Sequence, residues 1–146
     1  MTSQAPTVSA TPLAALPIIV NPSHLNDPTP NGYSTAVITP VAGRLAFISG
    51  QGGQDRTGAL SSDFGEQVKQ AYANLAAVMD ALGARLEQVV KLTVFVVDHD
   101  MSKLGVLTES VTRMFGAKLP AQTLVPVPKL AIDPMMFEVE AVVLLD

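Results

Sequence analysis

Two glutamates near the C-terminus have the residue type and spacing for proton transfer or for positioning a water molecule. Glu138 and Glu140 alternate with apolar residues, so both should lie on one face of the same strand. Burying a carboxylate in such a strand is costly unless it is paired or functional. The structural alternatives are exposure at a sheet end or pairing with Arg44 or Lys91. Both interpretations stay open for Glu138, and the structural one is favoured for Glu140.

Polar groups that could bind a ligand are expected at the ends of other strands. In the segment 120–125, Pro-Ala-Gln-Thr-Leu-Val, Gln122 lies where a loop enters a strand, a position that often lines a pocket. Its neutral amide suits an amide, carbonyl or hydroxyl partner. Tyr33 could offer a hydroxyl or simply pack its ring. Ser49 and Gly50 could present backbone N–H groups to a ligand oxygen or merely form a turn.

Other common chemistries find little support in the sequence. His24 and His99 lie in loop-like contexts, and the Asp98-His99-Asp100 run fits a solvated turn that caps the following helix better than a metal site. No HExxH motif, phosphate-binding glycine loop or nucleophile elbow is present. The absence of cysteine excludes disulfides, thiolate metal sites and a cysteine nucleophile.

Composition predicts a single domain with more apolar surface than one small chain can bury. The chain has 146 residues, of which 48% are hydrophobic and 15% charged, and no apolar run reaches the roughly 18–20 residues of a membrane span. Oligomer interfaces are the natural outlet for this surface. A net charge of −4 with nine scattered Lys and Arg residues argues against a nucleic-acid partner. Without an N-terminal secretory pattern, a cytoplasmic location is expected.

Hydrophobic periodicity predicts the elements that position these residues. A helix is expected over 64–82, with a capping box from Asp63 to Glu66 and Gly83 as its stop, and a second one over 102–115. We expect a flexible tail over 1–17 and one domain over 18–146. Within the domain, loops are expected over 21–32 and 50–58 and a turn over 40–43. Strands are expected over 34–39, 44–49, 89–97, 122–127 and 136–145.

The element order β-β-α-β-α-β-β has a consequence for assembly. Two helices can cover only one face of the sheet. Yet the strands over 89–97 and 136–145 carry apolar residues on both faces, which is typical of strands covered on each side. Something must therefore cover the second face, and the simplest candidate is another copy of the chain.

The order and spacing of these motifs resemble the RidA/YjgF family of enamine and imine deaminases, also labelled endoribonuclease L-PSP. The resemblance covers roughly residues 18–145. The matching segments are 32–37, 48–51, 66–67, 74–75, 83, 89–98, 120–123 and 138–141.

The resemblance implies a chorismate-mutase-like α+β subunit that assembles into a homotrimeric barrel with a cleft between neighbouring subunits. Typical members hydrolyse 2-enamino or 2-imino acids to 2-keto acids and ammonia, with no metal or organic cofactor. Glu138 would then position the attacking water or help with proton transfer. The pocket residues that carry over are Tyr33, Ser49, Gly50 and Glu138, with Gln122 and Leu124 at the positions of the arginine motif.

The sequence departs from the family pattern where the substrate carboxylate is normally held. Gln122 replaces an arginine, so a neutral amide stands where members have a bidentate cation. A charged hydrogen bond contributes about 1.5–3 kcal/mol and a neutral one about 1 kcal/mol. Pro126, which removes a backbone donor and indicates an edge or bulged strand, and Gly105 depart from the pattern too.

Three functions remain open from the sequence. The first is a deaminase-type hydrolase with an altered small substrate. The second is a non-catalytic homotrimer that binds a small metabolite in the same cleft. The third, an RNA-directed activity, is disfavoured by the acidic and unclustered charge.

Overall fold

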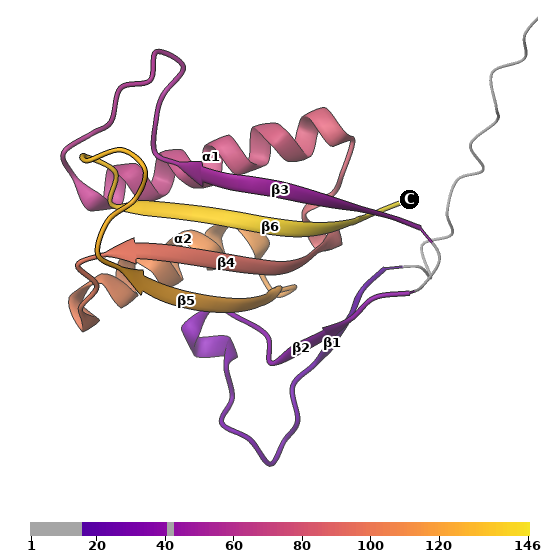
Figure 1. Cartoon of the computed structure of the whole chain (residues 1–146). Coiled ribbons are helices and arrows are strands. Elements are labelled where there is room, and N and C mark those ends of the chain that lie inside the picture. The colour runs from indigo at the N-terminus through magenta and orange to yellow at the C-terminus, as the bar shows by residue number, and fades with distance from the viewer. Residues whose placement is uncertain (1–15, 41–42) are drawn as a thin grey trace, which may run out of the picture.

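A four-stranded mixed sheet with two helices packed on one of its faces forms the centre of the protein (Figure 1). The computed structural model describes residues 16–40 and 43–146. This architecture confirms the predicted α+β class and the predicted order of its main elements. The strands are β1 (Ile18–Val20), β2 (Ala36–Ile38), β3 (Arg44–Gly52), β4 (Val89–Val97), β5 (Ala121–Val127) and β6 (Phe137–Leu145), and the helices are α1 (Phe64–Leu82), α2 (Leu104–Phe115) and the short 3-10 turns η2 (Thr29–Asn31), η3 (Leu86–Gln88) and η4 (Met101–Lys103).

The main sheet has the strand order β3-β6-β4-β5. β6 pairs antiparallel with β3 and β4, whereas β4 and β5 run parallel because the chain crosses back through α2. The predicted loop over 50–58 is wrong at its start. Gln51 and Gly52 still pair with Val139 and Glu138, so β3 continues through Gly52. The position of β5 at the sheet edge agrees with the interpretation of Pro126.

The N-terminal strands form a separate two-stranded sheet beside the main one (Figure 1). β2 is shorter than the predicted strand over 34–39 and pairs with β1. Ahead of β2, Ser34 bridges to Ala121, with its N–H donating to Pro120 O at 2.9 Å and its hydroxyl to Leu119 O. The segment around Ser34 therefore lies along the outer edge of β5. The tail predicted over 1–17 and the turn over 40–43 lie largely outside the described residues.

Both predicted helices form, with the expected caps. The Asp63 side chain accepts a hydrogen bond from Glu66 N at 2.9 Å, and Gly83 ends α1 in the left-handed region with φ 66°. The first turn of the helix predicted over 102–115 is the 3-10 turn η4, capped by Asp100, which accepts from Ser102 N at 2.8 Å. No helix in the described part of the chain is both long and apolar enough to cross a membrane.

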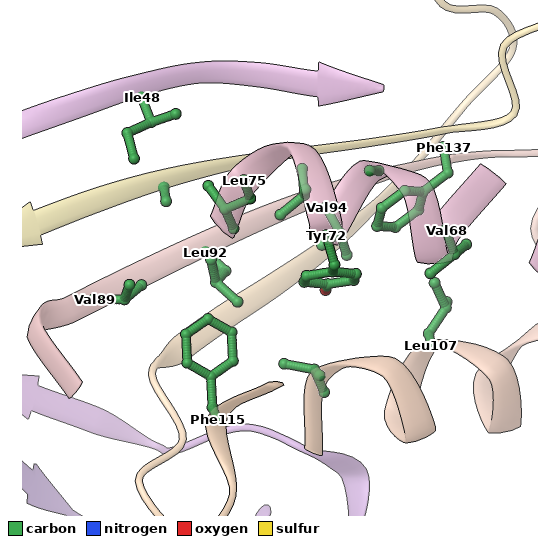
Figure 2. Packing of buried hydrophobic residues seen from close by; sticks show 14 of the residues in the cluster. Ile48, Val68, Tyr72, Leu75, Val89, Leu92, Val94, Leu107, Phe115 and Phe137 are labelled. Carbon is green, nitrogen blue, oxygen red and sulfur yellow. The ribbon is translucent and has the colours of Figure 1, made fainter. Parts of the chain in front are cut away.

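The hydrophobic core lies between the helices and the sheet (Figure 2). Alternate residues of β4 and β6 point into it, as the two-residue period predicts. Phe137 is fully buried, and its ring meets Phe64 edge-on at 6.4 Å and Tyr72 at 5.7 Å between centroids. The largest fully buried apolar side chains are Phe137, Leu75, Met79, Leu92, Val68, Val94, Val96, Val111, Val139 and Val143.

The opposite face of the sheet is open and also apolar. Phe47 is 75% exposed there and Leu45 is 52% exposed, and both lie on the edge strand β3. Val142, which pairs with Phe47, and Phe95 on β4 add to this surface. The prediction of two apolar faces, with helices on only one, is confirmed.

One buried polar side chain holds α1 to the loops that lead into the sheet. Gln67 is fully buried and makes three hydrogen bonds. Its amide nitrogen donates to Ser61 O at 2.7 Å and to Pro134 O at 2.8 Å, and its amide oxygen accepts from Met136 N at 2.8 Å. These bonds position the chain entering β6, the strand that carries Glu138.

Gln67→Ala should lower the free energy of unfolding by about 3 kcal/mol, because it removes three buried hydrogen bonds and leaves a cavity. Urea unfolding followed by circular dichroism measures this loss. Gln70→Ala, three residues further along α1, is the matched control, since Gln70 is only partly buried and bonds only to Asn74. Equal losses for the two variants would contradict the role given to Gln67.

Candidate active site

A β-bulge interrupts the pairing of β3 with β6 beside Glu138. Ile48 pairs with Ala141 but Gln51 pairs with Val139, so β3 has one extra residue at Ser49 and Gly50. Bulges of this kind re-aim side chains and leave backbone groups unpaired, and they are common next to active sites. Ser49 and Gly50 are therefore part of a bulged strand, in place of the strand end that the sequence predicted.

The Glu138 side chain packs directly against Gly50. A Cβ atom added to Gly50 would overlap the Glu138 carboxylate and would lie 2.7 Å from its Cγ. Only glycine leaves room for the carboxylate in this position. The structure thus brings together three of the predicted site residues, Ser49, Gly50 and Glu138, which we call the bulge group.

Neither glutamate of β6 pairs with Arg44 or Lys91, the two cations that the sequence offered as partners. None of the ion pairs among the described residues includes Glu138 or Glu140. Arg44 donates to the backbone oxygen of Asp146, and Lys91 donates to Thr123 Oγ1 at 2.7 Å. Glu138 is partly buried, whereas Glu140 is exposed at the rim of a small depression of about 100 Å³. Glu138 is therefore the carboxylate that needs a functional explanation.

The other predicted site residues gather at the opposite edge of the sheet. Gln122 and Leu124 lie on β5 beside Leu92 and Val94, so their side chains share the helix-covered face. The Ser34 bridge places Tyr33 along the same edge. We call Tyr33, Gln122 and Leu124 the edge group.

Gln122 carries an unsatisfied hydrogen-bond acceptor. Its Oε1 is buried and has no hydrogen-bond partner among the described residues. An amide oxygen left unpaired in this way costs about 1–3 kcal/mol. Native proteins rarely keep such an atom without a ligand, a water molecule or a partner chain to satisfy it.

The two groups cannot form one pocket within a single chain. Glu138 faces the open side of the sheet and Gln122 faces the helices. Two strand spacings, roughly 10 Å, separate β6 from β5. Within one chain the bulge group and the edge group therefore lie on different faces of the sheet.

The histidines do not join either group. His24 is exposed, and His99 keeps a buried Nδ1 that has no partner among the described residues. Asp100 instead caps η4, as predicted, and the hydrogen bonds from Ser102 hold the pKa of Asp100 below its usual value. In residues 16–40 and 43–146, no three His, Asp or Glu side chains lie close enough together to hold a metal ion.

Sequence reasoning missed the bulge and the amide that supports it. Asn74 Nδ2 donates to Gly52 O at 2.9 Å and to Gln54 O at 2.8 Å, and so anchors the chain after the bulge to α1. The closely spaced glycines at 50, 52 and 53 were the available signal, because each one leaves room for a specific neighbouring group.

The chain matches a known family over most of its length. The family model described as Endoribonuclease L-PSP matches residues 25–145. A RutC family protein of Pyrococcus horikoshii is 35% identical over 120 residues, which cover 80% of this chain and 90% of that protein. A 2-iminobutanoate/2-iminopropanoate deaminase of Salmonella typhimurium is 33% identical over 102 residues, covering 68% of this chain and 79% of the relative. The crystal structure of the Rid-family protein YyfB from Yersinia pestis aligns with a TM-score of 0.83 at 30% identity, covering 88% of this chain and 98% of that one.

Gly50→Ala should displace the Glu138 carboxylate while the fold survives, because the added methyl group takes the place of a movable side-chain end. We expect a loss of unfolding free energy below about 1 kcal/mol and a new Glu138 rotamer in a crystal structure of the variant. Gly105→Ala is the control: nothing lies within 4 Å of its Cβ position, and helix propensity predicts a gain of up to about 1 kcal/mol. An unmoved Glu138 in Gly50→Ala would refute the packing described here.

Proposed function

This chain belongs to the RidA/YjgF family, whose model is described as Endoribonuclease L-PSP, and from that premise we propose that it is a small-molecule hydrolase of the enamine/imine deaminase type. The observation that carries the proposal is the placement of Glu138. Its carboxylate has no cationic partner among the described residues. It packs against a glycine at a bulge in the open, apolar face of the sheet.

The bulge group suits hydrolysis of a carbon–nitrogen double bond. Glu138 accepts a proton from a water molecule as the water oxygen attacks the imine carbon. That proton passes to nitrogen and gives a carbinolamine. Glu138 then takes the proton of the new hydroxyl group and delivers it to the amine as the carbon–nitrogen bond breaks, so ammonia leaves and a carbonyl compound remains. Backbone N–H groups around Ser49 and Gly50, freed from regular pairing by the bulge, are available to orient the substrate.

The pocket itself is proposed to form between subunits of a homotrimer. The open face of β3 and β6 carries the bulge group and exposed apolar side chains, and the edge of β5 carries the edge group. Placing the β5 edge of one subunit against the open face of the next would bury Phe47 and unite the six residues. It would also give Gln122 Oε1 access to a ligand.

The glutamine at position 122 is proposed to change which substrate the pocket prefers. Its unsatisfied Oε1 is an acceptor, so a matching ligand must offer an N–H or O–H donor to it. A carboxylate offers only acceptors and would leave Oε1 unpaired. The alternative function is a non-catalytic homotrimer that binds a small metabolite in the same cleft, in which case Glu138 contributes binding alone.

Generating 2-iminobutanoate in situ and following keto-acid release tests the proposal. We expect release above the buffer rate, lowered at least 100-fold by Glu138→Gln, which keeps the shape but removes the proton acceptor. Gln122→Arg should lower KM for this carboxylate-bearing substrate about ten-fold, since a charged hydrogen bond replaces a neutral one.

The same assay separates the alternative. A wild-type protein at buffer rate, with an active Gln122→Arg variant, would mean that the pocket is intact but serves another ligand. Keto-acid release at the buffer rate by both the wild-type protein and Gln122→Arg would contradict the deaminase proposal.

Light scattering should give a mass three times the 15.3 kDa of one chain. Phe47→Asp should shift the protein toward the monomer mass, because it places a charge in the face proposed to be buried. Met101→Asp is the matched control, since Met101 is 82% exposed but lies on η4, away from that face. A monomeric wild-type protein would remove the proposed inter-subunit pocket.

A further inference from the structure

A second cavity lies between α1 and α2, on the side of the molecule away from the bulge group. Its volume is about 390 Å³, within the range of small-molecule sites. Small residues of α1 line one side of it and side chains of α2 line the other, and the cavity is partly open to solvent. The residues that matter for its chemistry are Lys69, Tyr72 and Ala76 on α1 and Val106, Arg113 and Met114 on α2.

Tyr72 brings an unused hydroxyl to this cavity. The Tyr72 side chain is only 6% exposed, and its ring packs against Phe137 in the core. The ring points from α1 toward α2 (Figure 2). The hydroxyl makes no hydrogen bond with any residue that the structure describes, and burial raises the pKa of Tyr72. It therefore stays protonated at neutral pH and is available as a donor to whatever occupies the cavity.

The charged groups around the cavity favour an anion. Arg113 is paired with Glu109 on the same helix, whereas Lys69 takes part in no ion pair within residues 16–40 and 43–146. Two cations and one carboxylate among the lining residues give a local charge of +1, against −4 for the whole chain. A single excess cation matches a ligand with a single negative charge.

We propose that this cavity binds an amphipathic monocarboxylate with an acyl or aryl body. The apolar body packs against Ala76, Val106 and Met114, and the carboxylate lies within reach of the Lys69 ammonium and the Tyr72 hydroxyl. A phosphate would carry more charge than one free lysine offsets and would leave most of the lining, which is apolar, unused. The site shares no residue with the bulge and edge groups and does not depend on the proposed deaminase activity.

Titration of the full ¹⁵N-labelled chain with octanoate, followed by NMR, tests the proposal. Saturable shifts should be confined to residues of α1 and α2 around the cavity. Octanoate should bind about two- to five-fold more tightly than octanol, because one partly exposed ion pair contributes a difference in affinity of this size. Octylamine should bind more weakly than either. Absence of saturation at millimolar octanoate, or shifts centred on the open face of the sheet, would overturn the assignment.

Four variants make the test specific. Ala76→Leu should occupy the part of the cavity where the apolar body of the ligand packs and so abolish binding, whereas Ala77→Leu, on an exposed neighbouring position outside the lining, should bind as wild type. Tyr72→Phe should weaken octanoate about five-fold through loss of one hydrogen bond. Lys69→Gln should remove the preference for octanoate over octanol. Octanoate binding by Ala76→Leu as tight as that of the wild type would refute the site. Keto-acid release by the same variant should be unchanged, so a failure of this site can be told apart from a failure of the deaminase proposal.

Discussion

The sheet is apolar on both faces, while the chain supplies helices for only one of them. Leu92, Val94 and their neighbours on β6 are buried beneath α1 and α2, but Phe47 on the other face is 75% exposed. At about 25 cal/mol per Å² of apolar surface, leaving such a face in water forfeits a sizeable part of the stability that folding could gain. The same open face carries Glu138, so the exposed apolar surface is also the surface that carries the candidate site.

A backbone irregularity creates the space that the Glu138 carboxylate occupies. Regular pairing between β3 and β6 would place a side chain next to the Glu138 carboxylate, whereas the bulge places Gly50 there. The arrangement is held from outside the sheet. Gln67 fixes the chain entering β6 and Asn74 fixes the chain leaving β3, so α1 sets the position of both strands by side-chain hydrogen bonds. The helix thus stabilises the geometry of a face that it never touches.

Local signals in the sequence were sufficient for the helices and for the faces of the central strands. Apolar spacing, the Asp63 cap and the Gly83 stop are properties of neighbouring residues, and they predicted α1 to the residue. The pairing of β2 with β1, and the bridge from Ser34 to Ala121 more than 80 residues away, join separate segments that no local pattern specifies. Likewise, the residue types of the site were predicted, but the face on which Gln122 lies follows from the register of β5 on β4.

The charge balance of the proposed pocket follows from the glutamine at position 122. Its six members, Tyr33, Ser49, Gly50, Gln122, Leu124 and Glu138, include one carboxylate and no cation. An arginine at position 122 would offset both Glu138 and a substrate carboxylate, whereas glutamine offsets neither. In an interior of low effective dielectric constant, two carboxylates within about 4–6 Å of each other disfavour being charged at the same time. A neutral or cationic ligand avoids this repulsion and can also donate to the unpaired Oε1 of Gln122, so the electrostatic and hydrogen-bonding arguments select the same class of molecule.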